Sequence, residues 1–165
     1  MQPKENGWIL AIDQASNCAG VSLWRNGALV DTTTLLSDSP KDALGKRLSR
    51  QVEQLTDWLH GRLGKAEIKT VLFEGVRSRL VLVTVGAFVC VPQLRHCKVH
   101  QRFSFIESTS WKNYARKRGA TNPKLGDIKG VPALREIGFP VDQHRIDSDD
   151  IADSILIYLC WRDKA

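Results

Sequence analysis

Apolar stretches separated by short polar turns at the start of the chain predict a hairpin followed by a third strand. Each stretch has a length typical of a strand, and the turns between them read QASNC, at residues 14–18, and RNG, at residues 25–27. The third stretch is rich in Val and Thr, which favour strands. The predicted strands are residues 8–13, residues 19–24 and residues 28–36.

A helix is expected next, because apolar residues then recur at spacings of three and four. The apolar stripe consists of Leu44, Leu48, Val52, Leu55, Leu59 and Leu63. Residues at these spacings lie on one face of a helix, which is expected to pack on the sheet. We expect Ser39 to be the N-cap, Pro40 to be the first helical residue and Gly64 to mark the end.

The second half of the chain predicts two more strands and several helices. Residues 68–76 form a short apolar strand, with Glu74 near its end, and residues 98–107 resemble another strand. The apolar run at residues 80–91 is longer than a typical strand, so we interpret it as a largely buried helix. Further helices are expected at residues 108–119, at residues 122–139 with a break near Gly130 and Pro132, and at residues 147–161 with Asp147 or Ser148 as N-cap.

This order of elements predicts an α/β fold made of a single domain over residues 1–165. The central sheet is expected to be mixed, with the first three strands antiparallel, the later strands parallel, and helices on its flanks. The 42% hydrophobic and 25% charged residues are ordinary for a globular domain, and 165 residues suffice to bury a core.

Charge is distributed unevenly and points to a polyanionic partner. The chain has 24 Lys and Arg against 18 Asp and Glu, a net charge of +6. Residues 75–124 contain ten basic residues and one acid, whereas residues 142–153 contain five acids and one Arg. A basic tract of this kind suits nucleic acid, although a merely solvated basic surface has the same composition.

Four acids stand where this fold would bring side chains together. Asp13 and Glu74 lie at or near the ends of predicted strands, and Asp150 and Asp153 share one face of the last helix. If the first and fourth strands are neighbours and this helix packs over their ends, the four carboxylates converge. Such a cluster repels itself unless divalent cations neutralise it, and two ions about 4 Å apart can hydrolyse a phosphodiester. Singly, each acid has a simpler interpretation, in a turn or at a helix N-terminus.

Three motifs carry a family resemblance: AIDQASNCAGVSLW, VLFEGV and DDIADSILI. In this order and spacing they resemble the RuvC-like Holliday-junction resolvases of the RNase H-like superfamily, in particular phage-type or divergent members. The resemblance extends from Trp8 to about Trp161. It implies an RNase H-like fold, two Mg²⁺ or Mn²⁺ ions per active site, and a homodimer that nicks four-way DNA junctions. The catalytic and metal-binding residues it implies are Asp13, Glu74, Asp150 and Asp153.

Basic residues near these motifs are the candidate DNA contacts. They are Arg77, Arg79, Lys112, Arg116, Lys117 and Lys124. By resemblance, Lys112 and Lys124 fall where resolvases carry basic residues close to the cleaved phosphate, and the whole WKNYARKRG stretch suits phosphate contacts. The chain departs from the cellular resolvases in two places. Gln14 and Ala15 stand where those proteins have Pro-Gly, and two arginines stand where they often have an aromatic wedge.

Several alternatives follow from the same residues. An RNase H-type nuclease on RNA–DNA hybrids shares the acid set, and a non-catalytic junction-binding protein could share the fold. The spacing of His96, Cys97 and His100 fits no standard zinc pattern. No apolar run is long enough to cross a membrane, and the four scattered cysteines, without a secretory signal, favour reduced thiols in the cytoplasm of a bacterium or phage-infected host.

Overall fold

The computed structural model describes residues 7–75, 79–94, 103–121 and 130–164, and its centre is a five-stranded mixed sheet. The strands are β1 (Trp8–Asp13), β2 (Cys18–Arg25), β3 (Ala28–Leu36), β4 (Ile68–Gly75) and β5 (Phe103–Glu107), in the order β3-β2-β1-β4-β5. The β1–β2 and β2–β3 pairs are antiparallel, whereas β4 joins β1, and β5 joins β4, in parallel. The mixed α/β architecture predicted from the sequence is therefore confirmed.

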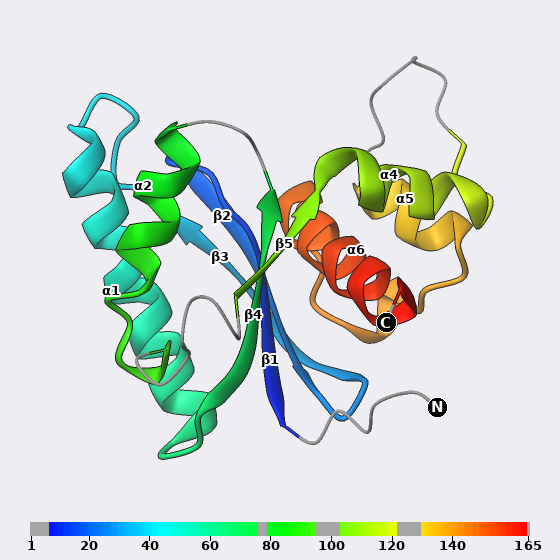
Figure 1. Ribbon diagram of the computed structural model, residues 1–165, viewed down its shortest axis with the longest axis horizontal. Helices are drawn as coiled ribbons and strands as arrows, with labels where there is room; N and C mark the ends of the chain where they lie inside the picture. Colours follow the sequence, from blue (N-terminus) through cyan, green and yellow to red (C-terminus); the bar gives the residue numbers. More distant parts are fainter. Residues whose placement is uncertain (1–6, 76–78, 95–102, 122–129, 165) are drawn as a thin grey trace.

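Helices cover both faces of this sheet (Figure 1). One face carries α1 (Leu44–Leu63) and α2 (Arg79–Phe88); the other carries α4 (Ser108–Lys117), α5 (Gly130–Glu136) and α6 (Asp149–Lys164). Alternate residues of the central strands bury their side chains on opposite faces, so each helical layer has its own core. In β1, Leu10 and Ile12 belong to the core under α1 and α2, whereas Ile9 and Ala11 belong to the core under α6.

The amphipathic helix α1 begins later than the sequence predicted. The hydroxyl and the carbonyl of Ser39 accept hydrogen bonds from the backbone N–H groups of Lys41, at 3.2 Å, and Asp42, at 3.1 Å. These local bonds satisfy the backbone as a turn, which competes with helix formation. The assignment of Ser39 as N-cap and of Pro40 as first helical residue is therefore wrong. The predicted end at Gly64 is confirmed.

The apolar run at residues 80–91 forms a helix, as predicted, but this helix is not largely buried. In α2, Val85 and Phe88 are buried against the sheet and α1, whereas Leu82 is 68% exposed and Val83 is 53% exposed. A helix on the outside of a sheet turns only one stripe inward, so apolar residues on its other face remain in solvent.

Three further boundaries can be compared with the sequence predictions. The described part of β5 begins at Phe103, and residues 98–102 lie outside the described residues. Gly130 is the first residue of α5, and Pro132 lies in its first turn, where a proline is tolerated. Residues 122–129 of the predicted helical region lie outside the described residues, so the predicted break near Gly130 stays a prediction. Ser148, one of the two predicted N-caps of α6, accepts a hydrogen bond from the N–H of Ile151 at 3.2 Å.

None of the helices in the described ranges combines the length and the apolar composition that a membrane crossing requires. Cys18, Cys90 and Cys160 are free thiols, while His96, Cys97 and His100 lie outside the described residues.

Candidate active site

The acidic cluster begins at the carboxyl ends of β1 and β4. These strands are parallel neighbours whose pairing extends to Ile12 and Phe73, so Asp13 and Glu74 occupy the next position on each strand. The carboxyl group of Glu74 is near enough to that of Asp13 to raise the pKa of Asp13. The two acids thus lie together at the edge where the parallel strands end.

Helix α6 adds two more acids, because its first turn packs directly on β2. Gly20 pairs with Asp13 across the hairpin and lies so close to the peptide between Asp150 and Ile151 that a β-carbon at Gly20 would overlap it. Glycine alone permits this approach of backbone to backbone. As a result, the charges of Asp150 and Asp153 are near enough to raise the pKa of Asp13.

Burial and neighbouring negative charges make this cluster difficult to ionise. Burial raises the pKa of Asp13 far above its ordinary value, and the contact with Glu74 and the charge of Asp153 raise it further. Burial also raises the pKa of Asp153 to about 8, with the charge of Glu74 acting in the same direction and the ammonium group of Lys112 opposing it. At neutral pH the cluster must therefore bind protons or a cation.

The polar contacts of α6 give its acids different surroundings. Asp149 accepts a hydrogen bond from the N–H of Val131 at 3.1 Å, so its carboxylate contacts the start of α5. Asp150 accepts one from the thiol of Cys18, with 3.0 Å between Sγ and Oδ2; burial and this bond raise the pKa of Cys18 to about 12, which keeps the thiol a donor. Oδ1 of Asp153 is buried without a hydrogen-bond partner among the described residues.

The chemistry of these residues fits a divalent cation. As the side chains stand, no three His, Cys, Asp or Glu residues within the described ranges form a closed ligand set. Carboxylate oxygens are nevertheless the ligands that Mg²⁺ and Mn²⁺ prefer. A cation would compete with the proton that Asp13 retains because of its raised pKa, and it would give the buried Oδ1 of Asp153 a partner.

The predicted basic residues divide into those that the structure places and those that it does not. Lys112, in the first half of α4, is close enough to Asp153 to act on its pKa. Arg116 and Lys117 are exposed one turn further along the same helix. Arg77 and Lys124 lie outside the described residues, and Arg79 begins α2 with a side chain that is not described.

Two side chains that hold the cluster were missed by the sequence interpretation. The amide of Gln14 bonds to both backbone groups of Glu74, and the thiol of Cys18 donates to Asp150. Both residues belong to the segment 14–18, which the sequence presents simply as a polar turn. The sequence feature that could have identified Gln14 and Cys18 is their position in the turn directly after Asp13.

Comparison with known proteins supports the fold. No family model matches the chain, and no curated protein matches its sequence. Similar solved structures include Thermus thermophilus RuvC in complex with a Holliday junction substrate, at 12% identity and a TM-score of 0.59, covering 94% of this chain and 92% of that one. A second is T. thermophilus RuvC, at 14% identity and a TM-score of 0.56, covering 93% and 92%. The chain therefore has the RuvC fold over nearly its whole length.

Proposed function

We propose that this chain, built on the RuvC fold, is a divalent-metal-dependent endonuclease that nicks Holliday or other branched DNA junctions. The observation that carries the proposal is the convergence of Asp13, Glu74, Asp150 and Asp153 at one end of the sheet, with Lys112 beside them. Partly buried carboxylates gathered from three separate elements destabilise the fold unless protons or a cation offset their charge. One similar structure is RuvC bound to a Holliday junction substrate, which supports branched DNA as the substrate class.

In this proposal the four acids hold two Mg²⁺ or Mn²⁺ ions through their carboxylate oxygens. When bound, such a pair of ions supplies an activated water and stabilises the leaving oxygen. Asp13 is the acid whose pKa is raised by Glu74, Asp153 and Asp150 together, so it would be central to holding the cations. The partly buried ammonium group of Lys112 holds the phosphate next to the acids.

The exposed basic residues of α4 extend this site along the DNA backbone. Lys112 and Arg116 are four residues apart and so lie on one side of the helix, and Lys117 follows. Their charges would neutralise phosphates without reading base sequence, as expected for an enzyme that recognises the shape of a junction.

Replacing Lys112 by alanine is expected to weaken junction binding and to lower the salt dependence of binding by about one phosphate contact. Binding would be measured by titration at several salt concentrations. Lys46→Ala is the matched control, because Lys46 of α1 pairs with Asp42, just before the helix, at 3.2 Å and its side chain is 66% exposed. Equal salt slopes for the two variants would remove Lys112 from the DNA interface.

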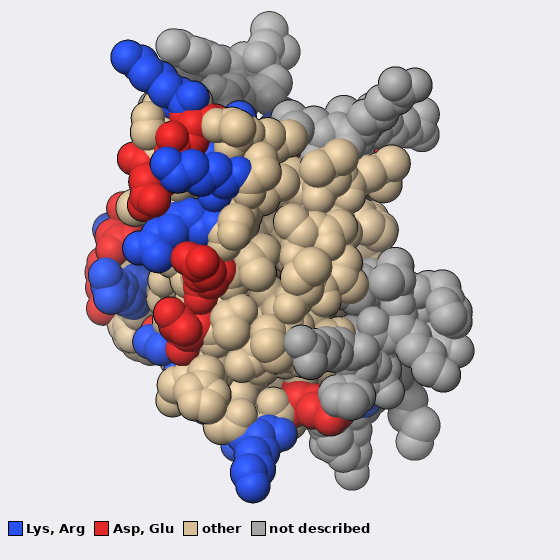
Figure 2. All heavy atoms as spheres, turned by 90° about the vertical axis from the view of Figure 1, so that its left-hand side faces the viewer, with Lys and Arg blue, Asp and Glu red and all other residues tan. Residues whose placement is uncertain are grey.

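We further propose that the chain acts as a homodimer through the outer face of α2. Leu82 and Val83 are exposed on this helix, and Figure 2 shows that the side of the molecule carrying α1 and α2 has a broad uncharged surface beside a strip of charged residues. Phe105 of β5, which is 46% exposed, stacks on Phe73 and so borders the same layer. Contiguous exposed apolar surface is typical of an interface, and two sites related by symmetry would cut both strands of a junction.

Leu82→Glu is expected to convert the dimer to a monomer, because a charge at the centre of an apolar interface stays desolvated and unpaired. Sedimentation at several protein concentrations would measure this. Val30→Glu is the control, since Val30 is 47% exposed on β3, at the opposite edge of the sheet. If the wild type sediments at 18.5 kDa at every concentration, the dimer proposal is wrong.

The experiment that tests the function uses labelled four-way, three-way, hybrid and linear duplexes, each with and without Mg²⁺ or Mn²⁺. We expect metal-dependent nicking of the branched DNA and little cleavage of linear duplex. Cleavage of the RNA–DNA hybrid alone would instead assign the site to an RNase H-type nuclease. Junction binding without nicking under any divalent cation would make the chain a non-catalytic binding protein.

A further inference from the structure

The turn that follows Asp13 is held in place by several other elements. Each of residues 14–18 takes part in a hydrogen bond with a residue outside this segment. Nε2 of Gln51 donates to the carbonyl of Ala15 at 2.9 Å, and the guanidinium of Arg47 donates to Ser16 and Asn17 at 2.8 and 2.6 Å. Gln51 is fully buried, although it lies on the apolar side of α1. Helix α1 therefore fixes the middle of the turn.

At the first end of the turn, the side-chain amide of Gln14 continues the hydrogen bonding of the sheet. Nε2 of Gln14 donates to the carbonyl of Glu74 at 2.6 Å, and the N–H of Glu74 donates to Oε1 of Gln14 at 3.1 Å. The recorded pairing of β1 with β4 stops at Ile12 and Phe73. The amide of Gln14 thus takes the place of one more peptide group, and it fixes the backbone of Glu74 at the point where β1 itself has ended.

The second end of the turn contacts the other half of the acidic cluster. Sγ of Cys18 lies 3.0 Å from Oδ2 of Asp150 and donates to it. Cys18 is the first residue of β2, two residues before the close approach of Gly20 to α6. The turn therefore reaches an acid on β4 with one end and an acid on α6 with the other, while Asp13 precedes it directly.

We propose that Gln14 and Cys18 are positioning residues that set Glu74 and Asp150 relative to Asp13, so that the acids hold a divalent cation. This inference rests on the metal-dependent function proposed above. Gln14 acts on the backbone of Glu74 and Cys18 on the carboxylate of Asp150, so neither needs to contact the cation. Groups that orient metal ligands in this way typically change metal affinity about 10- to 100-fold when they are removed.

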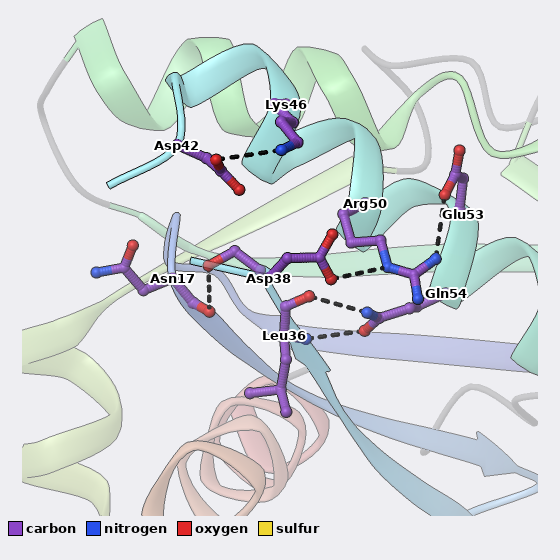
Figure 3. A network of polar contacts seen from close by, with 9 residues as sticks. Asn17, Leu36, Asp38, Asp42, Lys46, Arg50, Glu53 and Gln54 are labelled. Atoms are coloured by element: carbon purple, nitrogen blue, oxygen red, sulfur yellow. Dashed lines mark hydrogen bonds and ion pairs between the residues drawn. The ribbon is translucent and has the colours of Figure 1, made fainter. Parts of the chain in front are cut away.

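The chain offers a matched control for Gln14. Gln54 makes the same pair of hydrogen bonds with a backbone: its Oε1 accepts from the N–H of Leu36 at 2.8 Å, and its Nε2 donates to the carbonyl of Leu36 at 2.9 Å. We call such a pair of hydrogen bonds, from one side-chain amide to both backbone groups of one residue, a clasp. Figure 3 shows the Gln54 clasp beside the surface ion pairs that Arg50 makes with Asp38 and Glu53. None of those residues contacts an acid of the cluster, and Gln54 is linked to it only through the pairing of Leu36 with Cys18, so loss of the Gln54 hydrogen bonds should affect the cluster far less than loss of those of Gln14.

The first test needs neither metal nor DNA. Amide hydrogen exchange followed by NMR would compare Gln14→Met with Gln54→Met, since methionine keeps the length of the side chain without its hydrogen bonds. We expect the N–H of Glu74 to exchange at least about fivefold faster in Gln14→Met, because one hydrogen bond is lost. In Gln54→Met only the N–H of Leu36 should respond. If the exchange of Glu74 is the same in wild type and Gln14→Met, the clasp does not fix Glu74 and the proposal is overturned.

The second test measures binding of Mn²⁺ by calorimetry. Gln14→Met and Cys18→Ala are expected to raise the dissociation constant about tenfold, whereas Gln54→Met and the conservative Cys18→Ser, which keeps a donor, should remain close to wild type. Equal Mn²⁺ affinity in all four variants would overturn the positioning roles. If this pattern is found but no DNA is cut, the positioning roles stand and the nuclease function fails.

Discussion

Asp13→Asn is expected to lower the rate of junction cleavage at least about a hundredfold, the size of effect seen when one preorganised charge-stabilising group is removed. The asparagine keeps the shape of the side chain and one oxygen, but it has no charge to hold a cation. Asp13 interacts both with Glu74 and with the acids of α6, so its loss affects both halves of the cluster. Junction binding should persist, because the basic residues of α4 are untouched.

The same substitution is expected to stabilise the metal-free protein by about 1–3 kcal/mol at neutral pH, since it removes a buried ionisable group. Thermal unfolding in the presence of a chelator would measure this. Asp142→Asn is the control, because the side chain of Asp142 is 86% exposed and its ion pair among the described residues is with Arg135. A variant that still cut at the wild-type rate would remove Asp13 from the metal site.

The metal-free protein is expected to lose stability as pH rises from about 4 to about 8. The pKa of Asp153 is raised from 3.8 to about 8, and that of Asp13 is also raised, in both cases first of all by burial. A raised pKa means that the folded state binds protons more tightly than the unfolded state. Its contribution to stability is therefore complete below the unfolded pKa of about 4 and is lost as pH rises through the folded pKa.

Adding Mg²⁺ should reverse this loss and should stabilise the protein more at pH 8 than at pH 5, because the cation binds ionised carboxylates and competes with protons. Melting temperatures at a series of pH values, with Mg²⁺ and with chelator, would test this; a change of 1 kcal/mol corresponds to about 2–4 °C for a chain of this size. Melting curves that move with pH equally in both solutions would show that the cluster binds no cation.

The sheet was predictable because its signals are local and agree with one another. Each of these elements shows an apolar pattern bounded by turn residues. They are the first hairpin, the strand that carries Glu74 and helix α1 with its leucine stripe. The closeness of Asp13 to Glu74 follows from parallel pairing alone, because such strands end at the same edge.

Other features depended on contacts that no local pattern encodes. Serine is a common N-cap residue, but Ser39 makes short-range hydrogen bonds that place it in a turn before the helix. The apolar content of α2 exceeds what one buried stripe requires, so composition alone overestimated its burial. Gln14 and Cys18 are ordinary polar turn residues in sequence, and their roles arise from β4 and α6, which lie far along the chain.

The separation in sequence of Asp13 and Asp153 has a consequence for biosynthesis. The docking of α6 onto Gly20 is the contact that unites them, and it joins residues from opposite ends of the described chain. A nascent polypeptide still lacking α6 carries only the Asp13–Glu74 half of the cluster. In the function proposed above, activity against DNA would therefore arise only once α6 has been synthesised and has docked on β2.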